Sequence, residues 1–156
     1  MDDTAREIIN TFLAQYDTIA IATEHQGQPY VTRAFYAEQP IHDTTLTLYG
    51  TFITTSRKLA NLQQNPRVGL FIGPSQPTAW LEATALAHVI TDEGTSAAVR
   101  ERLSRKSAVA AGFIARLPIV AVELQVNWLR ITNVAANPRQ IEVTFPMTPP
   151  EEEEKR

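Results

Sequence analysis

The pattern of apolar positions begins with a helical period. Near the start of the chain, apolar residues recur every three or four places, at Ile8, Ile9, Phe12, Leu13 and Tyr16. This spacing puts them on one stripe of a helix. Thr4-Ala5-Arg6-Glu7 has the capping-box pattern, in which Thr and Glu satisfy free backbone donors at a helix start. The pattern therefore predicts a short amphipathic helix that packs on a sheet.

From Thr18 the period changes to that of strands. TIAIAT and PYVTRAFYA are rich in β-branched and aromatic residues, and HQGQ between them carries a glycine suited to a hairpin turn. Four further strands are predicted in TLTLYG, RVGLFIG, AWLEATALAHVI and the long PIVAVELQVNWLRITNV. A short helix from about Ser56 to Gln64 ends at Asn65-Pro66, because the residue before a proline is driven out of the helical region. Residues 95–116 predict a helical insert with a break near Ser107.

The order of these elements predicts a mainly β fold with flanking helices. Short hairpin connections favour antiparallel pairing, and six such strands tend to close into a small barrel. No internal repeat and no domain boundary is visible, so we expect one domain over residues 1–146. Residues 147–156 are rich in proline and then acidic, which predicts a disordered tail.

The composition excludes several kinds of site and partner. The chain has no cysteine, which removes disulfides, thiolate metal sites and cysteine nucleophiles. The net charge is −3, but the last six residues hold four acids and two bases, leaving thirteen acidic and twelve basic residues elsewhere. A body this close to neutral does not favour nucleic acid as a partner. The three histidines are scattered, so no metal site is expected.

The first residues of the chain and the length of its apolar runs predict its cellular location. MDDTAREIINTF is acidic and then amphipathic, whereas a signal peptide is basic and then apolar. No apolar run approaches the ~20 residues that cross a bilayer. We therefore expect a cytoplasmic protein without a membrane partner.

The most informative stretch runs from Arg33 to Lys58. Strand alternation puts Val31, Arg33 and Phe35 on one face, and a charged side chain on such a face needs a partner. Thr54-Thr55-Ser56-Arg57-Lys58 then brings hydroxyls and cations to a helix start, where free N–H groups and the helix dipole favour an anion. This combination suits a phosphate monoester. A simple helix cap and a solvated helix face are the alternative interpretation of the same residues.

A family resemblance adds to this interpretation. Gly27-x-Pro29, an Arg-bearing strand, Tyr49-Gly50 and the run SRKLANLQQNPRVGLFI resemble the pyridoxamine 5′-phosphate oxidase-like family of flavin-binding split barrels, over roughly residues 17–90. The resemblance implies an antiparallel split β-barrel of Greek-key type. It also implies a homodimer with two sites for flavin mononucleotide (FMN) at its interface, acting as an oxidoreductase on a small molecule.

The resemblance assigns roles residue by residue. Arg33 matches an arginine that contacts FMN, and Ser56, Arg57 and Lys58 match the segment that holds its phosphate. The remaining implied cofactor-binding residues lie beside the ring, on the third strand or across the dimer: Tyr49, Gly50, Thr51, Trp80 and Trp128. Trp80 stands where the family has a polar residue. The C-terminal arginine motif that holds pyridoxamine phosphate is absent, so we do not expect pyridoxamine phosphate oxidase activity.

Other cofactors and residues remain open. The deazaflavin F420 could place its phosphate in a similar basic pocket, and a flavin or haem carrier without turnover could share the fold. His88 or His42 would then be the haem ligand to test. The cations of Arg100–Lys106 are predicted to form a solvated helix face.

Overall fold

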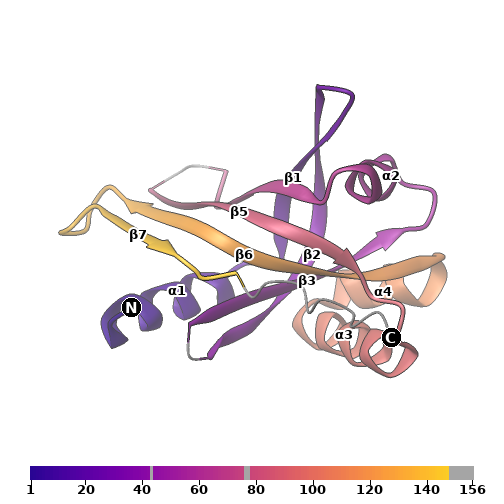
Figure 1. Ribbon diagram of the computed structural model, residues 1–156. Coiled ribbons are helices and arrows are strands. Elements are labelled where there is room, and N and C mark those ends of the chain that lie inside the picture. Colours follow the sequence, from indigo (N-terminus) through magenta and orange to yellow (C-terminus); the bar gives the residue numbers. More distant parts are fainter. Residues whose placement is uncertain (43, 76–77, 148–156) are drawn as a thin grey trace, which may run out of the picture.

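The structure, a computed structural model, describes residues 1–42, 44–75 and 78–147 (Figure 1). The described elements follow one another as α1 (Asp3–Ala14), β1 (Thr18–His25), β2 (Gln28–His42), β3 (Thr45–Ile53), α2 (Arg57–Gln64), β4 (Arg67–Ile72), β5 (Ala79–Val89), α3 (Glu93–Lys106), α4 (Ala108–Arg116), β6 (Ile119–Asn133) and β7 (Gln140–Thr144). The predicted order of strands and helices is confirmed. The predicted disorder of the tail falls on residues 148–156, outside the described residues, apart from Met147.

The strands form one antiparallel sheet that closes on itself. Its order is β3-β2-β1-β4-β5-β6-β7, and an additional pairing joins β3 to β6. The six predicted strands therefore make the closed ring. The first half of β6 pairs with β3 and its second half pairs with β7, while β5 pairs along its other edge. This division of β6 between two neighbours gives the split barrel.

The sequence analysis missed β7. This five-residue strand pairs Ile141 with Ile131 and Val143 with Leu129. Its alternating pattern covers too few residues to stand out, and the connection from β6, residues 134–139, is longer than the tight turns that mark a hairpin in sequence. The correct count among the described residues is seven strands rather than six.

Local sequence explains how the elements begin and end. The β1–β2 turn has positive φ at Gln26 (51°) and Gly27 (80°), as a two-residue hairpin with the right twist requires. α2 begins at its N-cap Ser56 and ends before Asn65, as predicted. α1 begins earlier than predicted, because the Asp2 side chain accepts the Ala5 N–H at 2.7 Å and is the N-cap in place of Thr4.

The barrel interior holds the main core. Alternate residues of the strands point inward, and Phe52, Leu124 and Leu129 are fully buried there. α1 adds Ile9, Phe12 and Leu13 to this core at one side of the barrel. A smaller cluster forms outside the ring, where Val99 and Leu103 of α3 pack on Ala37 and Ala121. In Figure 1, α1, α3 and α4 lie below the strands, and α2 lies above with the β1–β2 hairpin.

Two cations of the Arg100–Lys106 cluster attach α3 to the barrel. Lys106 forms an ion pair with Glu38, donates to the Leu13 carbonyl at 3.0 Å and lies over the Tyr36 ring at 3.9 Å. Arg102 donates to the Glu38 carbonyl at 3.0 Å. The predicted solvated face is therefore wrong for these two residues. Helical spacing alone could not show that β2 supplies a carboxylate beneath the helix.

The described helices include none that is long and apolar enough to pass through a bilayer.

The Lys106–Glu38 pair gives a stability prediction. Lys106→Met keeps most of the packed stem but leaves the Glu38 carboxylate, whose side chain is 16% exposed, without its partner. We expect the free energy of unfolding in urea to fall by roughly 2–4 kcal/mol, because a broken buried ion pair leaves an uncompensated charge. The double variant Glu38→Gln/Lys106→Met should recover part of the loss. Arg105→Ala, an exposed neighbour, should change stability by less than about 0.5 kcal/mol. Unchanged stability of Lys106→Met would show that the pair does not hold α3.

Candidate functional site

Strands and helices from four parts of the chain enclose a cavity of about 260 Å³. The residues that line it come from β1, β2, β3, α2, α4 and the start of β6. The residues that line it are Thr18, Arg33, Ala34, Phe35, Thr51, Ile53, Lys58, Phe113, Leu117 and Ile119. Three of these, Arg33, Thr51 and Lys58, are residues that the sequence analysis assigned to cofactor binding.

Strand alternation and helix position bring Arg33 and Lys58 to this cavity. The predicted faces of β2 are confirmed: Ala34 and Tyr36 are buried, whereas Val31 and Arg33 are exposed on the outer face. Lys58 stands in the first turn of α2, with its ammonium 5.3 Å from the centre of the Phe52 ring. In the part of the chain that the structure describes, neither cation has a carboxylate partner. Two unpaired cations beside one cavity make it a site for an anion.

Burial affects the Lys58 ammonium directly. Because its surroundings are partly desolvated, the pKa of Lys58 lies below the usual value of 10.5. A charged group retained in a partly buried place without a carboxylate partner costs stability in the free protein. Such a cost is typical of a group kept for binding.

Apart from Thr18 and Thr51, the rest of the cavity wall is apolar. The Phe35 and Phe113 rings pack with their centres 5.6 Å apart at an interplanar angle of 49°. Leu117, Ile53 and Ile119 continue this wall. The cavity therefore offers positive charge together with aromatic and aliphatic surface, which suits an amphipathic anion with a flat ring. The sequence analysis did not assign Phe113 or Leu117 to the site, since only docking of α4 brings them there.

The other predicted residues of β3 divide between its two faces. Thr51 and Ile53 point outward and line the cavity, whereas Gly50 is buried. A Cβ at Gly50 would lie 2.9 Å from Phe52 Cε1, so the strand has no room for a side chain there. Tyr49 points outward but packs under α3, and its hydroxyl donates to Gln39 Oε1 at 2.9 Å. Burial raises the pKa of Tyr49, with the nearby Glu123 carboxylate as a further cause.

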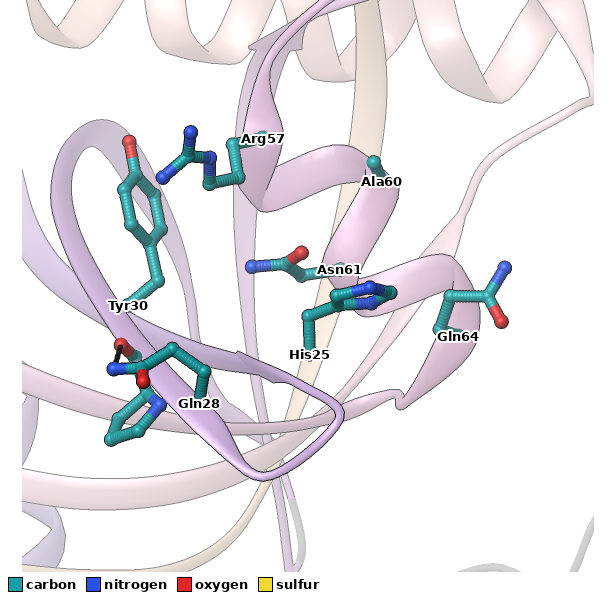
Figure 2. Close-up of a pocket in the computed structure, with 8 residues that line it drawn as sticks. His25, Gln28, Tyr30, Arg57, Ala60, Asn61 and Gln64 are labelled. Carbon is teal, nitrogen blue, oxygen red and sulfur yellow. Dashed lines mark hydrogen bonds between the residues drawn. The ribbon is translucent and has the colours of Figure 1, made fainter.

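Ser56 and Arg57 do not line this cavity. The Ser56 hydroxyl accepts the Leu59 N–H at 3.4 Å and caps α2. Arg57 turns to a second cavity, the α2 groove, where its guanidinium lies 5.1 Å from the centre of the Tyr30 ring (Figure 2). The four groups predicted to meet on one phosphate are thus divided, with Arg33 and Lys58 at one cavity and Arg57 at the other.

Trp80 and Trp128 lie far along the sheet from Arg33. Pairing places Val31, Ala22, Gly69, Thr84 and Trp128 in one cross-strand row on the outer face. Four strand spacings separate the ends of this row, about 19 Å along the sheet. The Trp128 indole N–H donates to Glu142 Oε1 at 2.7 Å. Within one chain, the tryptophans and the Arg33 cavity do not form one site.

Comparison with known proteins identifies the family. The family model described as pyridoxamine 5′-phosphate oxidase matches residues 5–136. The chain belongs to the pyridoxamine 5′-phosphate oxidase family. A search of curated proteins finds no significant match. The match to the family model confirms the resemblance drawn from the sequence motifs.

Solved structures agree with the split-barrel fold of the pyridoxamine 5′-phosphate oxidase family. A Clostridium acetobutylicum protein related to general stress protein 26 is 14% identical, with a TM-score of 0.66, and the match covers 92% of this chain and 96% of that one. A haem-binding protein from Mycobacterium smegmatis is 20% identical, with a TM-score of 0.70 and coverage of 92% and 59%. An FAD-binding protein from Mesorhizobium loti is 20% identical, with a TM-score of 0.60 and coverage of 80% and 90%. At these identities the likeness establishes the fold.

The unpaired Lys58 gives a second stability prediction. We expect Lys58→Met to raise the free energy of unfolding of the ligand-free protein by roughly 0.5–2 kcal/mol, because it removes a desolvated charge. Since the pKa of Lys58 is lowered on folding, the unfolded chain binds more protons at this group between the lowered value and 10.5. Wild-type stability from this group therefore rises with pH in that window, and the advantage of the variant shrinks. Urea unfolding at several pH values measures both effects. A variant less stable than wild type would mean that the contact with Phe52 outweighs desolvation.

Proposed function

We propose that this protein is an FMN-binding oxidoreductase that acts on a small molecule as a cytoplasmic homodimer. The observation that carries the proposal is that Arg33 and Lys58, both without a carboxylate partner among the described residues, line one cavity whose remaining wall is mostly aromatic and aliphatic. The phosphate of FMN would supply the negative charge that pairs with these two cations. The flavin ring system suits the wall formed by Phe35 and Phe113. The haem- and FAD-binding proteins of the same fold show that this architecture accommodates planar cofactors.

The residues present fit this cofactor. Arg33 and Lys58 would hold the phosphate through charge-assisted hydrogen bonds, which are shorter and stronger than neutral ones. Binding an anion would offset the desolvation of the Lys58 ammonium. Thr51 Oγ1 would donate to or accept from a polar group of the cofactor, and Phe113 would keep water from the ring. The flavin, when bound, supplies the electron transfer, while the chain binds and orients it.

The outer face of the sheet supports the proposed homodimer. Val31 is 67% exposed and Phe71 is 43% exposed, with the small residues Ala22 and Gly69 between them in the paired strands. The cross-strand row of Phe71 also holds Arg33 and Glu82, so this face combines exposed apolar side chains with charged ones, as surfaces that bind a partner do. The cavity of about 260 Å³ is also smaller than the roughly 300–1,000 Å³ of typical ligand pockets. A second copy on this face would enlarge the site and bring the partner subunit's Trp80 and Trp128 toward the flavin.

The absorption spectrum of the purified protein separates FMN from the alternatives. Two flavin bands support the proposal, whereas a single deazaflavin band or a haem Soret band would replace FMN as the cofactor. His88 is exposed on β5 and His42 ends β2, and neither is among the residues that line the cavity. Anaerobic bleaching of the flavin by a nicotinamide nucleotide, followed by reoxidation by an added acceptor, would separate an enzyme from a carrier.

The phosphate contacts give a binding prediction. We expect Arg33→Ala and Lys58→Ala each to weaken FMN binding by roughly 10- to 100-fold, because each removes a charge-assisted hydrogen bond. The variants should bind riboflavin, which lacks the phosphate, as the wild type does. Isothermal titration with both ligands measures the difference, and Arg105→Ala is the control for loss of a surface cation. Equal losses for FMN and riboflavin would show that the cations do not act on the phosphate.

The outer face gives an assembly prediction. Phe71→Glu puts a carboxylate on the apolar face, at a residue that does not line the cavity. We expect the variant to be monomeric in sedimentation velocity where the wild type is dimeric, since burying an unpaired charge is costly. Its affinity for FMN should fall by more than tenfold if the site needs two chains. A dimeric variant with unchanged affinity would place the interface elsewhere.

A further inference from the structure

A second cavity, the α2 groove, lies between the β1–β2 hairpin and α2, with a volume of about 720 Å³. The hairpin contributes His25, Gln28, Pro29 and Tyr30, and α2 contributes Arg57, Ala60, Asn61 and Gln64 (Figure 2). The helical residues are spaced by three and four, so they form one face, while Leu59 and Leu62 face the core. Nothing in the proposed flavin site uses this groove.

The groove favours an anionic group. Arg57 is exposed, and no carboxylate is among the described residues that line the groove. Glu24 precedes the groove residue His25, but its carboxylate has other partners. Its two oxygens accept from the Gly27 N–H at 2.7 Å and from Asn65 Nδ2 at 2.9 Å. Arg57 therefore keeps its charge available for a ligand.

The groove also favours a flat ring with hydrogen-bonding edges. The Arg57 guanidinium lies 5.1 Å from the centre of the Tyr30 ring, and aromatic rings with a nearby guanidinium are surfaces on which bases stack. Asn61 is only 5% exposed, and its Nδ2 donates to Thr23 Oγ1 at 3.0 Å, so its Oδ1 is the polar atom left to the groove. The Gln64 amide adds a donor and an acceptor, while the Gln28 Nε2 donates to the Pro29 carbonyl at 3.3 Å and leaves Oε1 as an acceptor (Figure 2). Amide oxygens accept from the N6 amino group of adenine, and an amide with a free N–H, such as that of Gln64, also donates to N7.

The groove and the flavin cavity meet at the start of one helix. Arg57 and Lys58 are consecutive residues of α2, yet Arg57 lines the groove and Lys58 lines the cavity. The Leu59 and Ala60 N–H groups donate to Ser56, whereas the backbone N–H groups of Arg57 and Lys58 have no acceptor among the described residues and favour phosphate. A ligand with two phosphates could therefore reach from one cavity to the other.

We propose that the α2 groove binds the adenosine 5′-phosphate part of a nucleotide, with its base against Tyr30 and its phosphate at Arg57. Two sources of this group fit the site. One is FAD, whose flavin half would fill the Arg33–Lys58 cavity, and this form rests on the proposed function. The other is a nicotinamide adenine dinucleotide that brings electrons to a separately bound flavin. The groove itself does not depend on either.

The test compares wild-type protein with Tyr30→Ala, Tyr30→Phe and Ala60→Trp by isothermal titration with AMP. Tyr30→Ala removes the ring, and Ala60→Trp fills the groove from the exposed side of α2 without removing a core contact. We expect both to weaken AMP binding at least tenfold. Tyr30→Phe keeps the ring and should bind AMP within threefold of wild type. Unfolding midpoints check that each variant folds, and Ala60→Trp provides the test if Tyr30→Ala does not.

Titrations with FMN, FAD and NADH then identify the source. If FAD binds wild type at least tenfold more tightly than FMN and Tyr30→Ala abolishes that difference, the groove holds the adenosine half of FAD. If FAD and FMN bind alike but NADH binding falls at least tenfold in Tyr30→Ala, the groove holds the electron donor. Absence of saturable AMP binding to wild type, or equal AMP affinity in all variants, would overturn the proposal. Loss of flavin binding with retained AMP binding would reject the proposed function and leave the groove assignment intact.

Discussion

The candidate site depends on the pairing of β3 with the first half of β6. Thr51 lies opposite Ala121 and Ile53 opposite Ile119, and the Thr54 N–H donates to the Pro118 carbonyl at 3.0 Å just beyond the strands. This pairing closes the ring and fixes where the chain enters β6. Since α4 ends directly before β6, closure also sets the position of Phe113 and Leu117 above Phe35. A barrel left open at this seam would separate the two walls of the cavity.

The helical insert is held in place by a second constraint. Lys106 links Glu38 on β2 with the Leu13 carbonyl in the last turn of α1, and the Tyr36 hydroxyl donates to the same carbonyl at 2.6 Å. Three segments far apart in sequence thus share one set of polar contacts. The cost of removing these groups from water is offset only when all of them are paired, which favours a single arrangement of α3 on the barrel.

The cations of the candidate site differ from those that hold the fold together. Lys106 and Arg130 have carboxylate partners, whereas Arg33 and Lys58 have none among the described residues. The chain therefore pairs its structural cations and leaves those of the cavity available. The cavity and the α2 groove meet at the start of α2, where the first two helical residues face different sides because consecutive residues of a helix differ by about 100° in direction. That rotation separates Arg57 from Lys58, although they are neighbours in the sequence.

The sequence by itself determined what local geometry controls. Alternation in PYVTRAFYA placed Arg33 on the outer face, Ser56 and Asn65-Pro66 set the limits of α2, and Gly27 set the hairpin turn. The motif around SRKLANLQQNPRVGLFI identified the family. Tertiary structure alone decided which side chains meet: it brought Phe113 over Phe35, put Glu38 beneath Lys106 and placed the β1–β2 hairpin beside Arg57. These features depend on contacts between residues distant in the chain. The spacing of residues within one segment does not predict which residues of another segment will contact it.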